Sequence, residues 1–293
     1  SYAVTSKYTD YNAVNLFANY DMTFGKHDIS VMGGYNQESS HTESQYSYRT
    51  DVVVGSLPSL SLSTGTPITN DAFEEFAIRG LFYRVNYSYA GKYLLEANGR
   101  YDGTSRFPKN SRFGFFPSFS AGWRISEENF MKTTNEWLSN LKLRASWGSI
   151  GNQVILKSDN TPDNYPYIPD MNVYLSNWLV DGQKVTTLGA PAMVSSSFGW
   201  EKVYTLDFGF DLDLFNNKLN TTFDWYRRDT KGMLAPGMEL PGVVGASAAK
   251  QNAADLKTYG WELKINWHDR IGDVGYRVGF NLYDSQSEIT KYD

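Results

Sequence analysis

The sequence predicts an all-β protein, a segment of a transmembrane antiparallel up-and-down β-barrel, and three observations lead to this prediction. Apolar and polar residues alternate over runs of about ten residues, most clearly at 81–89 and 93–101. The apolar positions are rich in aromatic residues, which border the lipid-facing band of outer-membrane barrels. Short and long connections between the runs alternate along the chain.

The two runs between Leu81 and Tyr101 show the alternation best. Their odd positions are mainly apolar or aromatic, and their even positions are mostly polar or charged. Because successive strand side chains point to opposite faces, one face is apolar and the other is polar. Tyr93 and Tyr101 are roughly 26 Å apart at 3.3 Å per residue. A tilt of about 40° reduces this to about 20 Å, close to the height of the apolar band in a barrel.

The same alternation recurs in ten segments. Their outward apolar positions are expected at 14–22, 29–35, 81–89, 93–101, 119–125, 141–147, 204–214, 219–225, 261–267 and 276–282. Short turns are expected near residues 25, 90, 216 and 270, and long loops at 36–75, 102–115, 148–203 and 227–258. Outer-membrane barrels likewise have tight periplasmic turns and long external loops.

The connection at 126–140 falls on the side of the short turns. We expect it to hold one helical turn with Ser126 as its N-cap and Glu127 and Glu128 in the first turn.

Composition excludes several functional classes. No stretch reaches the roughly 18 apolar residues of a transmembrane helix, and the net charge of −5 gives no reason to expect a nucleic-acid partner. The three histidines are scattered, no phosphate-binding loop is present, and there is no cysteine. We therefore expect no enzyme, no cofactor and no metal site.

Both ends of the sequence suggest a piece of a longer protein. The chain opens Ser1-Tyr2-Ala3, without the charged-then-apolar start of a signal peptide, and closes within a polar run.

Four ordered motifs resemble a known family. They are Tyr93-Leu94-Leu95-Glu96-Ala97-Asn98-Gly99-Arg100-Tyr101-Asp102-Gly103-Thr104-Ser105-Arg106-Phe107, Phe113-Gly114-Phe115-Phe116-Pro117-Ser118, Gly122-Trp123-Arg124-Ile125-Ser126-Glu127-Glu128 and Leu141-Lys142-Leu143-Arg144-Ala145-Ser146-Trp147-Gly148, closing at Gly151-Asn152-Gln153. Over residues 80–153 the chain resembles the barrel of SusC/RagA-type TonB-dependent transporters of the outer membrane.

The resemblance implies a 22-stranded barrel closed by an N-terminal plug, to which residues 1–293 would supply ten middle strands. The plug domain and the C-terminal strands would be absent from this segment. Such proteins import glycans or peptides across the outer membrane of Bacteroidetes-type Gram-negative bacteria. A SusD-like surface lipoprotein and, through the plug segment, the TonB complex would be the partners.

Charged residues at inward positions are the first candidate site. Arg84, Arg100, Arg124 and Arg144, with Lys142, form a basic sector, while Asp207 and Asp211, with Asp213, form an acidic one. We expect this wall to face the plug; the alternative is an ordinary solvated barrel interior.

Aromatic residues of the longest loop are the second candidate site. Tyr165, Tyr167, Tyr174 and Trp178 lie near Asp163, Asn164 and Asp170, and could hold a sugar or a peptide. They could equally pack the loop or contact the lipoprotein.

Two other functions fit the alternation. One is a stand-alone porin or adhesin whose ten strands close on themselves. The other is a soluble all-β binding module, such as a cell-surface lectin.

Overall fold

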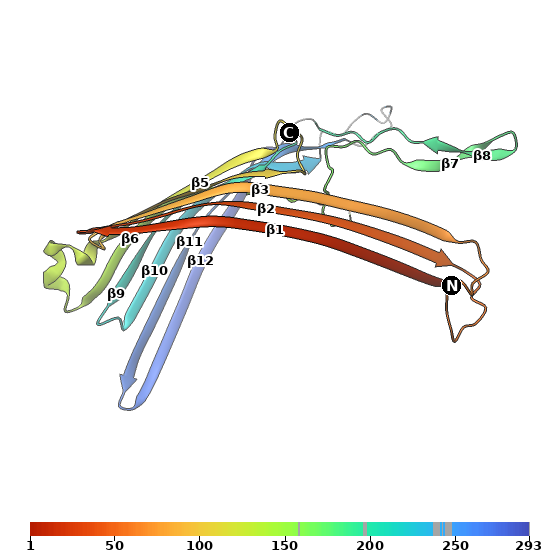
Figure 1. Ribbon diagram of the computed structural model, residues 1–293. Coiled ribbons are helices and arrows are strands. Elements are labelled where there is room, and N and C mark those ends of the chain that lie inside the picture. The colour runs from red at the N-terminus through yellow and green to blue at the C-terminus, as the bar shows by residue number, and fades with distance from the viewer. Residues whose placement is uncertain (158, 196–197, 237–240, 242, 244–247, 293) are drawn as a thin grey trace.

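The computed structural model describes residues 1–293 except 158, 196–197, 237–240, 242, 244–247 and 293. Ten strands form one antiparallel sheet in the order β1-β2-β3-β4-β5-β6-β9-β10-β11-β12, and β7 and β8 pair separately. Figure 1 shows the large sheet as a continuous curved wall. The strands are β1 (Tyr2–Phe24), β2 (His27–Arg49), β3 (Ile68–Tyr89), β4 (Tyr93–Thr104), β5 (Phe113–Arg124), β6 (Leu138–Asn152), β7 (Val173–Val180), β8 (Gln183–Leu188), β9 (Glu201–Leu214), β10 (Leu219–Pro236), β11 (Lys250–Ile271) and β12 (Val274–Tyr292).

All ten alternating segments of the sequence are strands of this wall, which confirms the predicted fold class. Their register keeps the apolar positions in line across neighbouring strands. Tyr35 lies opposite Leu16 on one side and Leu81 on the other, and Leu81 in turn lies opposite Tyr101. The apolar residues of neighbouring strands therefore lie on the same face of the wall. A shift of one residue in the pairing would have moved the apolar residues of a strand to the other face.

The short connections gather at one end of the wall, which we call the short-turn rim (25–26, 90–92, 125–137, 215–218 and 272–273). Ala90 and Gly91 both have positive φ, 53° and 66°, as the tight turns that suit twisted strands require. The opposite end, the long-loop rim, carries the connections 50–67, 105–112 and 153–200 and the connection after β10. Part of the predicted loops 148–203 and 227–258 lies outside the described residues.

The predicted loop boundaries were wrong at this end, because the strands run further. The expected loop 36–75 is strand up to Arg49 and again from Ile68, so that the connection itself is 50–67. Similarly, β10 extends to Pro236 and β11 begins at Lys250. Apolar and polar residues alternate only where one face of a strand is in an apolar environment. Where both faces are in water the alternation is lost, although the backbone pairing of the strands continues.

The predicted helical turn at 126–140 was also wrong in detail. The segment holds two 3₁₀ helices, η1 (Ile125–Glu127) and η2 (Asn129–Thr134). Ser126 lies inside η1, and the residues that precede the two helices, Arg124 and Glu128, make no side-chain capping bond.

The described residues form no second layer over the sheet, and the one cluster of buried apolar side chains lies among the long loops. Large apolar residues such as Leu16 and Leu95 stay more than half exposed to the surroundings. β1 and β12 are the two ends of the strand order and do not pair with each other. This arrangement speaks against a soluble sandwich and against ten strands that close on themselves.

Among the described residues, neither 3₁₀ helix nor any other helical segment is long and apolar enough to cross a bilayer.

Candidate functional site

The outer face of the wall, defined by the predicted apolar positions, is bordered by rows of aromatic rings. At the short-turn rim the rings of Phe24, His27, Tyr89, Tyr93 and Trp123 follow one another with centroid separations of 4.7, 4.9, 6.3 and 6.3 Å. Further up, Phe119, Trp147 and Tyr204 form a second row, at 6.1 and 6.3 Å. Above these, Tyr101 and Phe113 stack at 5.3 Å. An apolar face that carries aromatic rings at both of its ends is the pattern of a lipid-facing band.

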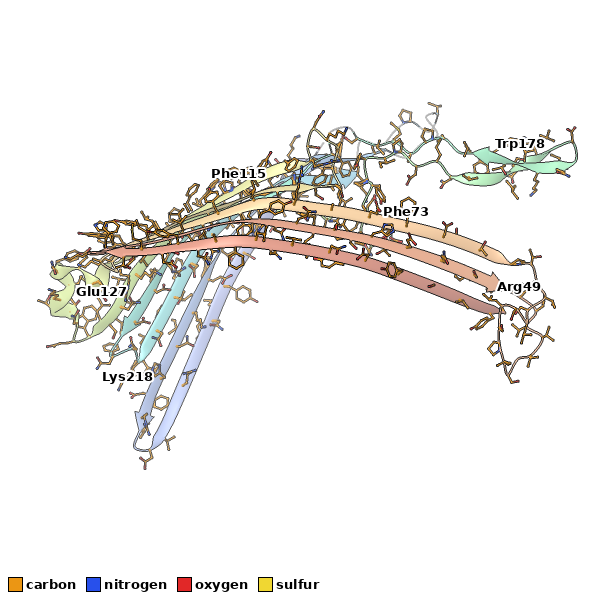
Figure 2. The ribbon with its side chains drawn as sticks, viewed as in Figure 1. Arg49, Phe73, Phe115, Glu127, Trp178 and Lys218 are labelled. Carbon is orange, nitrogen blue, oxygen red and sulfur yellow. The ribbon has the colours of Figure 1, made fainter. Side chains whose placement is uncertain are left out.

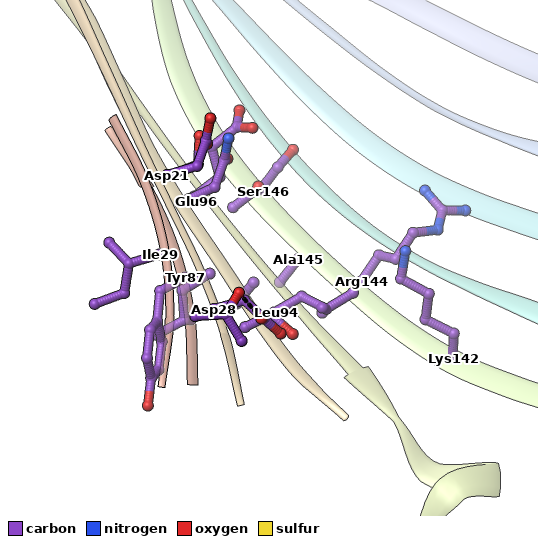
Figure 3. Close-up of a pocket in the computed structure, with 18 of the residues that line it drawn as sticks. Asp21, Asp28, Ile29, Tyr87, Leu94, Glu96, Lys142, Arg144, Ala145 and Ser146 are labelled. Atoms are coloured by element: carbon purple, nitrogen blue, oxygen red, sulfur yellow. Dashed lines mark hydrogen bonds between the residues drawn. The ribbon is translucent and has the colours of Figure 1, made fainter. Parts of the chain in front are cut away.

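The inner face carries the charges. Asp21, Glu96, Lys142, Arg144 and Asp207 line one groove of about 560 Å³ although they come from β1, β4, β6 and β9. Only a wall that curves toward this face brings such distant strands to one hollow. Figure 3 shows Lys142 and Arg144 pointing into the concave side and Ile29 and Tyr87 pointing away from it.

Arg144 is the centre of the ion pairs on this wall. Its guanidinium donates to Asp211 through Nε and Nη2, at 3.0 and 3.2 Å, and lies 2.9 Å from a carboxylate oxygen of Asp224. The predicted basic and acidic sectors therefore meet along β6, β9 and β10 and neutralise each other there. Asp213 accepts from the amides of Asn140 and Asn220 on the strands beside it.

Three of the predicted inner-wall residues, Arg84, Arg100 and Arg124, lie outside this groove. Arg100 binds Asp102 on its own strand with two bonds of 2.9 Å and lies over the ring of Phe82. Arg124 stands at the short-turn rim, 3.6 Å from Glu127. Arg84 is exposed. Asp207, by contrast, lies with Arg144 in the groove and also in a polar hollow with Asp224 and Glu262.

A small core, which the sequence did not reveal, holds the long loops together. Phe107, Ile155 and Phe198 are at most 4% exposed, and Trp200 and Leu234 pack against them. The Trp200 ring meets Phe107 edge-on at 5.3 Å, and its indole N–H donates to the carbonyl of Arg112 at 3.1 Å. The only sequence signal was the presence of these large rings in otherwise polar loops.

Buried polar contacts reinforce this loop core. Arg106 donates through Nε to Asn164 at 2.9 Å, and both side chains are buried. Asn252 of β11 accepts from the N–H of Gly199 and donates to the carbonyls of Gly199 and Gly232. The connections 105–112 and 153–200 are thus fixed to each other and to the upper ends of β10 and β11.

The four predicted loop aromatics fall into two separate places. Tyr165 lies near the top of β3, where its hydroxyl accepts from the N–H of Glu75 at 2.8 Å, and it shares a polar hollow with Asp163 and Asp170. Tyr167 is half-buried beside it in sequence. Tyr174 and Trp178 are exposed on the β7–β8 hairpin, which projects away from the wall (Figure 2).

The upper parts of β1, β2 and β3 extend beyond the apolar band and carry a histidine between carboxylates. His41 contacts Glu75 through Nδ1 at 2.6 Å and Glu43 through Nε2 at 2.9 Å, and Asp10 lies opposite it on β1. The hydrogen bonds to the two glutamates raise the pKa of His41 above its ordinary value.

Comparison with known proteins places the chain in a family. The family described as "TonB dependent receptor-like, beta-barrel" matches residues 1–293. TonB-dependent receptor P3 of Formosa agariphila is 31% identical over 279 residues, which are 94% of this chain and 27% of the relative. TonB-dependent receptor SusC of Bacteroides thetaiotaomicron is 34% identical over 216 residues, 72% of this chain and 20% of the relative. The chain thus spans about a quarter of the length of the curated relatives it matches.

Solved structures share the fold. The RagAB peptide importer in its closed-closed state superposes with a TM-score of 0.86 at 23% identity, covering 99% of this chain and 31% of that one. The outer membrane transporter YddB of Escherichia coli has a TM-score of 0.61 at 11% identity, covering 97% of this chain and 34% of that one.

Proposed function

This chain belongs to the TonB-dependent receptor-like β-barrel family, and we propose that the protein that contains it imports glycans or peptides across the outer membrane. As in the rest of this family, the barrel lies in the outer membrane of Gram-negative bacteria. With that location, the short-turn rim faces the periplasm and the long-loop rim faces the outside.

The observation that carries the proposal is the difference in polarity between the two faces of the wall. The outer face offers aliphatic and aromatic residues, whereas the inner face offers charges from β1 to β9 around one hollow. A wall of this kind can surround a polar, movable body while it closes its backbone hydrogen bonds against lipid. The likeness to SusC by sequence and to RagAB by fold supports the same reading.

Within this proposal, the inner-wall charges contact a plug domain supplied by the rest of the protein. Arg84, Arg100 and Arg124 are the candidates for direct contact, because their side chains are largely exposed at inward positions. Arg144 and Asp211 neutralise each other and hold the wall itself. Asp207, in its polar hollow, is a further contact.

The external loops capture the cargo. Tyr165 and Tyr167 stand on the fixed loop core, whereas Tyr174 and Trp178 stand on the projecting hairpin. We propose that the first pair contacts substrate at the mouth of the barrel and that the hairpin reaches either substrate or a SusD-like lipoprotein. TonB, acting through the plug, is the proposed source of energy.

The experiment is transport by the full-length protein in its host. Cells would be given a maltodextrin mixture or a peptic digest of casein as probes, with the natural protein, with the gene deleted, and with TonB inactivated. The proposal expects uptake of one probe that is lost in both mutants. Uptake of neither probe, or uptake that persists without TonB, would contradict it.

A liposome assay separates the importer from the porin alternative. Full-length protein in liposomes should leave small sugars entrapped, because the plug closes the barrel. Free passage of sugars in the absence of TonB would indicate an open pore and would overturn the importer proposal.

A further inference from the structure

The connection between β5 and β6, residues 125–137, differs from the other connections of the short-turn rim. The others are turns of a few residues, whereas this one carries η1 and η2. We call it the elbow. It lies at the tip of the wall near Glu127 in Figure 2.

The elbow is attached to the lipid-facing side of the wall. Glu128 accepts three hydrogen bonds, from the hydroxyl of Tyr93 at 2.6 Å, from Lys92 at 3.1 Å and from the indole N–H of Trp123 at 3.2 Å. Tyr93 and Trp123 both belong to the outer face. These bonds hold the pKa of the Glu128 carboxyl below its ordinary value, so that it remains a charged acceptor near neutral pH.

Burial gives an independent indication of the same placement. Leu138 lies opposite Leu214, on the outer face, after a local shift in register. It is only 3% exposed, whereas Leu143 further along the same face of β6 is 42% exposed. Something therefore covers the lower end of the outer face at Leu138, and the elbow is the segment that immediately precedes it.

The elbow also continues the lower aromatic row. The row that begins at Phe24 reaches Trp123 on β5. Beyond the elbow, at the start of the next short turn, the ring centroid of Phe215 lies 6.3 Å from that of Trp267. Between them, the carbonyl of Trp137 accepts from the N–H of Phe215 at 2.7 Å. Phe130 and Trp137 are 66% and 48% exposed, and Lys132 is exposed beside them.

Directly above this segment the outer face is hollowed and almost wholly apolar. The groove is lined by residues of β4, β5, β6 and β9, among them Tyr93, Leu95, Trp123, Leu143 and Phe208. Its lower end is thus formed by the same Tyr93 and Trp123 that bind Glu128. Apolar surface followed by aromatic rings and then by a lysine is the order met on passing from acyl chains to phosphate groups.

We propose that the elbow is a lipid anchor that lies in the headgroup layer of the inner leaflet of the outer membrane. Phe130 and Trp137 enter the boundary of the acyl chains, Lys132 faces the lipid phosphates, and acyl chains of these lipids fill the groove above. The proposal rests on the membrane location of the barrel and not on import, so it can fail while the importer proposal stands.

The test places a fluorescent label on the elbow of the full-length protein in liposomes. The chain contains no cysteine, so Phe130→Cys gives one labelling site here once any cysteine elsewhere in the protein is replaced. A polarity-sensitive label would be compared in phosphatidylethanolamine–phosphatidylglycerol vesicles with and without lipids brominated near the headgroup end of their chains. Electrophoretic mobility with and without heating verifies that each variant is folded.

Two control positions calibrate the signal. Leu57→Cys, in the external connection 50–67, has a similar exposure of 63% and should not be quenched. Ala97→Cys, midway between Tyr93 and Tyr101 on the outer face of β4, should be quenched more strongly by bromine placed deep in the chain than by bromine near the headgroup. The proposal expects the label at position 130 to be quenched at least twofold, most strongly by shallow bromine. Quenching no greater than at position 57 would overturn it.

A second variant tests the attachment. Glu128→Ala removes the acceptor shared by Tyr93, Trp123 and Lys92, and should shift the label at position 130 toward a watery emission with weaker quenching. If position 130 is quenched equally with and without Glu128, the attachment proposed here is wrong.

Discussion

The wall and the long-loop region differ in whether their large apolar side chains are covered by other parts of the protein. In the wall, large apolar side chains such as Leu95 and Leu143 remain 52% and 42% exposed, and no protein layer covers them. In the loops, Phe107 and Phe198 are buried almost completely against Trp200. Where lipid is the solvent, an apolar side chain needs no protein partner, whereas in water it needs a core.

This difference predicts that substitutions lower the stability of the two regions for different reasons. In the loops, a truncation costs packing and leaves a cavity. In the wall, a charge on the outer face costs transfer into hydrocarbon, and on the inner face it costs little.

The largest effect is expected in the loop core. Phe107→Ala removes a ring that is 1% exposed and packs edge-on against Trp200, and should cost about 3–5 kcal/mol of local stability. Hydrogen exchange of residues 104–113 in the full-length protein would measure it. Leu57→Ala, at an exposed loop position, is the control and should change nothing measurable; equal effects of the two variants would contradict a packed loop core.

The next effect concerns the two faces of the wall. Ala97→Arg should cost about 2–4 kcal/mol, because it places a charge midway between Tyr93 and Tyr101, near the middle of the bilayer. Leu95→Arg and Leu143→Arg lie nearer the aromatic row at the short-turn rim and should cost less, because the penalty falls toward the interface. Asn98→Arg, at an inner position beside Glu96, should cost much less. Denaturant midpoints in lipid bilayers would compare the variants, and equal losses on both faces would show that the sidedness is wrong.

A smaller effect is expected on the inner face. Arg144→Ala leaves Asp211 and Asp224, both about a quarter to a third exposed, without their shared cation. The cost should be about 1–2 kcal/mol, between that of a surface pair and that of a fully buried one. Arg277→Ala, at an exposed inner position of β12, is the matched control and should be close to neutral in the same unfolding assay.

The smallest effect is a pH dependence in the upper parts of β1–β3. Because the folded pKa of His41 is raised above its unfolded value of about 6.5, the associated stabilisation is fully present below that value. It is lost as the pH rises through the folded pKa. Hydrogen exchange of residues 37–49 should therefore accelerate with pH beyond its intrinsic trend, and His41→Gln should abolish the excess. An unchanged excess in that variant would assign it to another group.

The sequence predicted the parts of the fold that meet lipid. The order of the ten strands and their two faces followed from alternation at positions such as those from Tyr93 to Tyr101, since one face had to be apolar. Strand ends above the band were missed, because Ser39 to Gln45 lies in water on both faces and shows no alternation.

Site residues were harder to predict, because their partners are distant in sequence. No local sequence pattern predicts the hydrogen bond between Arg106 and Asn164. The same holds for the ion pairs of Arg144 with Asp211 and Asp224. The separation of Tyr165 from Trp178 arises because the hairpin of β7 and β8 carries the latter away from the wall.

The most direct measurement is a spin-label scan of β4 from residue 94 to residue 100 in the full-length protein in bilayers. Collisions with dissolved oxygen report lipid, and collisions with a water-soluble nickel chelate report water. Labels at 95, 97 and 99 should favour oxygen and labels at 94, 96, 98 and 100 should favour nickel, with a period of two residues. Absence of this period, or the opposite phase, would contradict the assignment of the tyrosine-rich face to lipid.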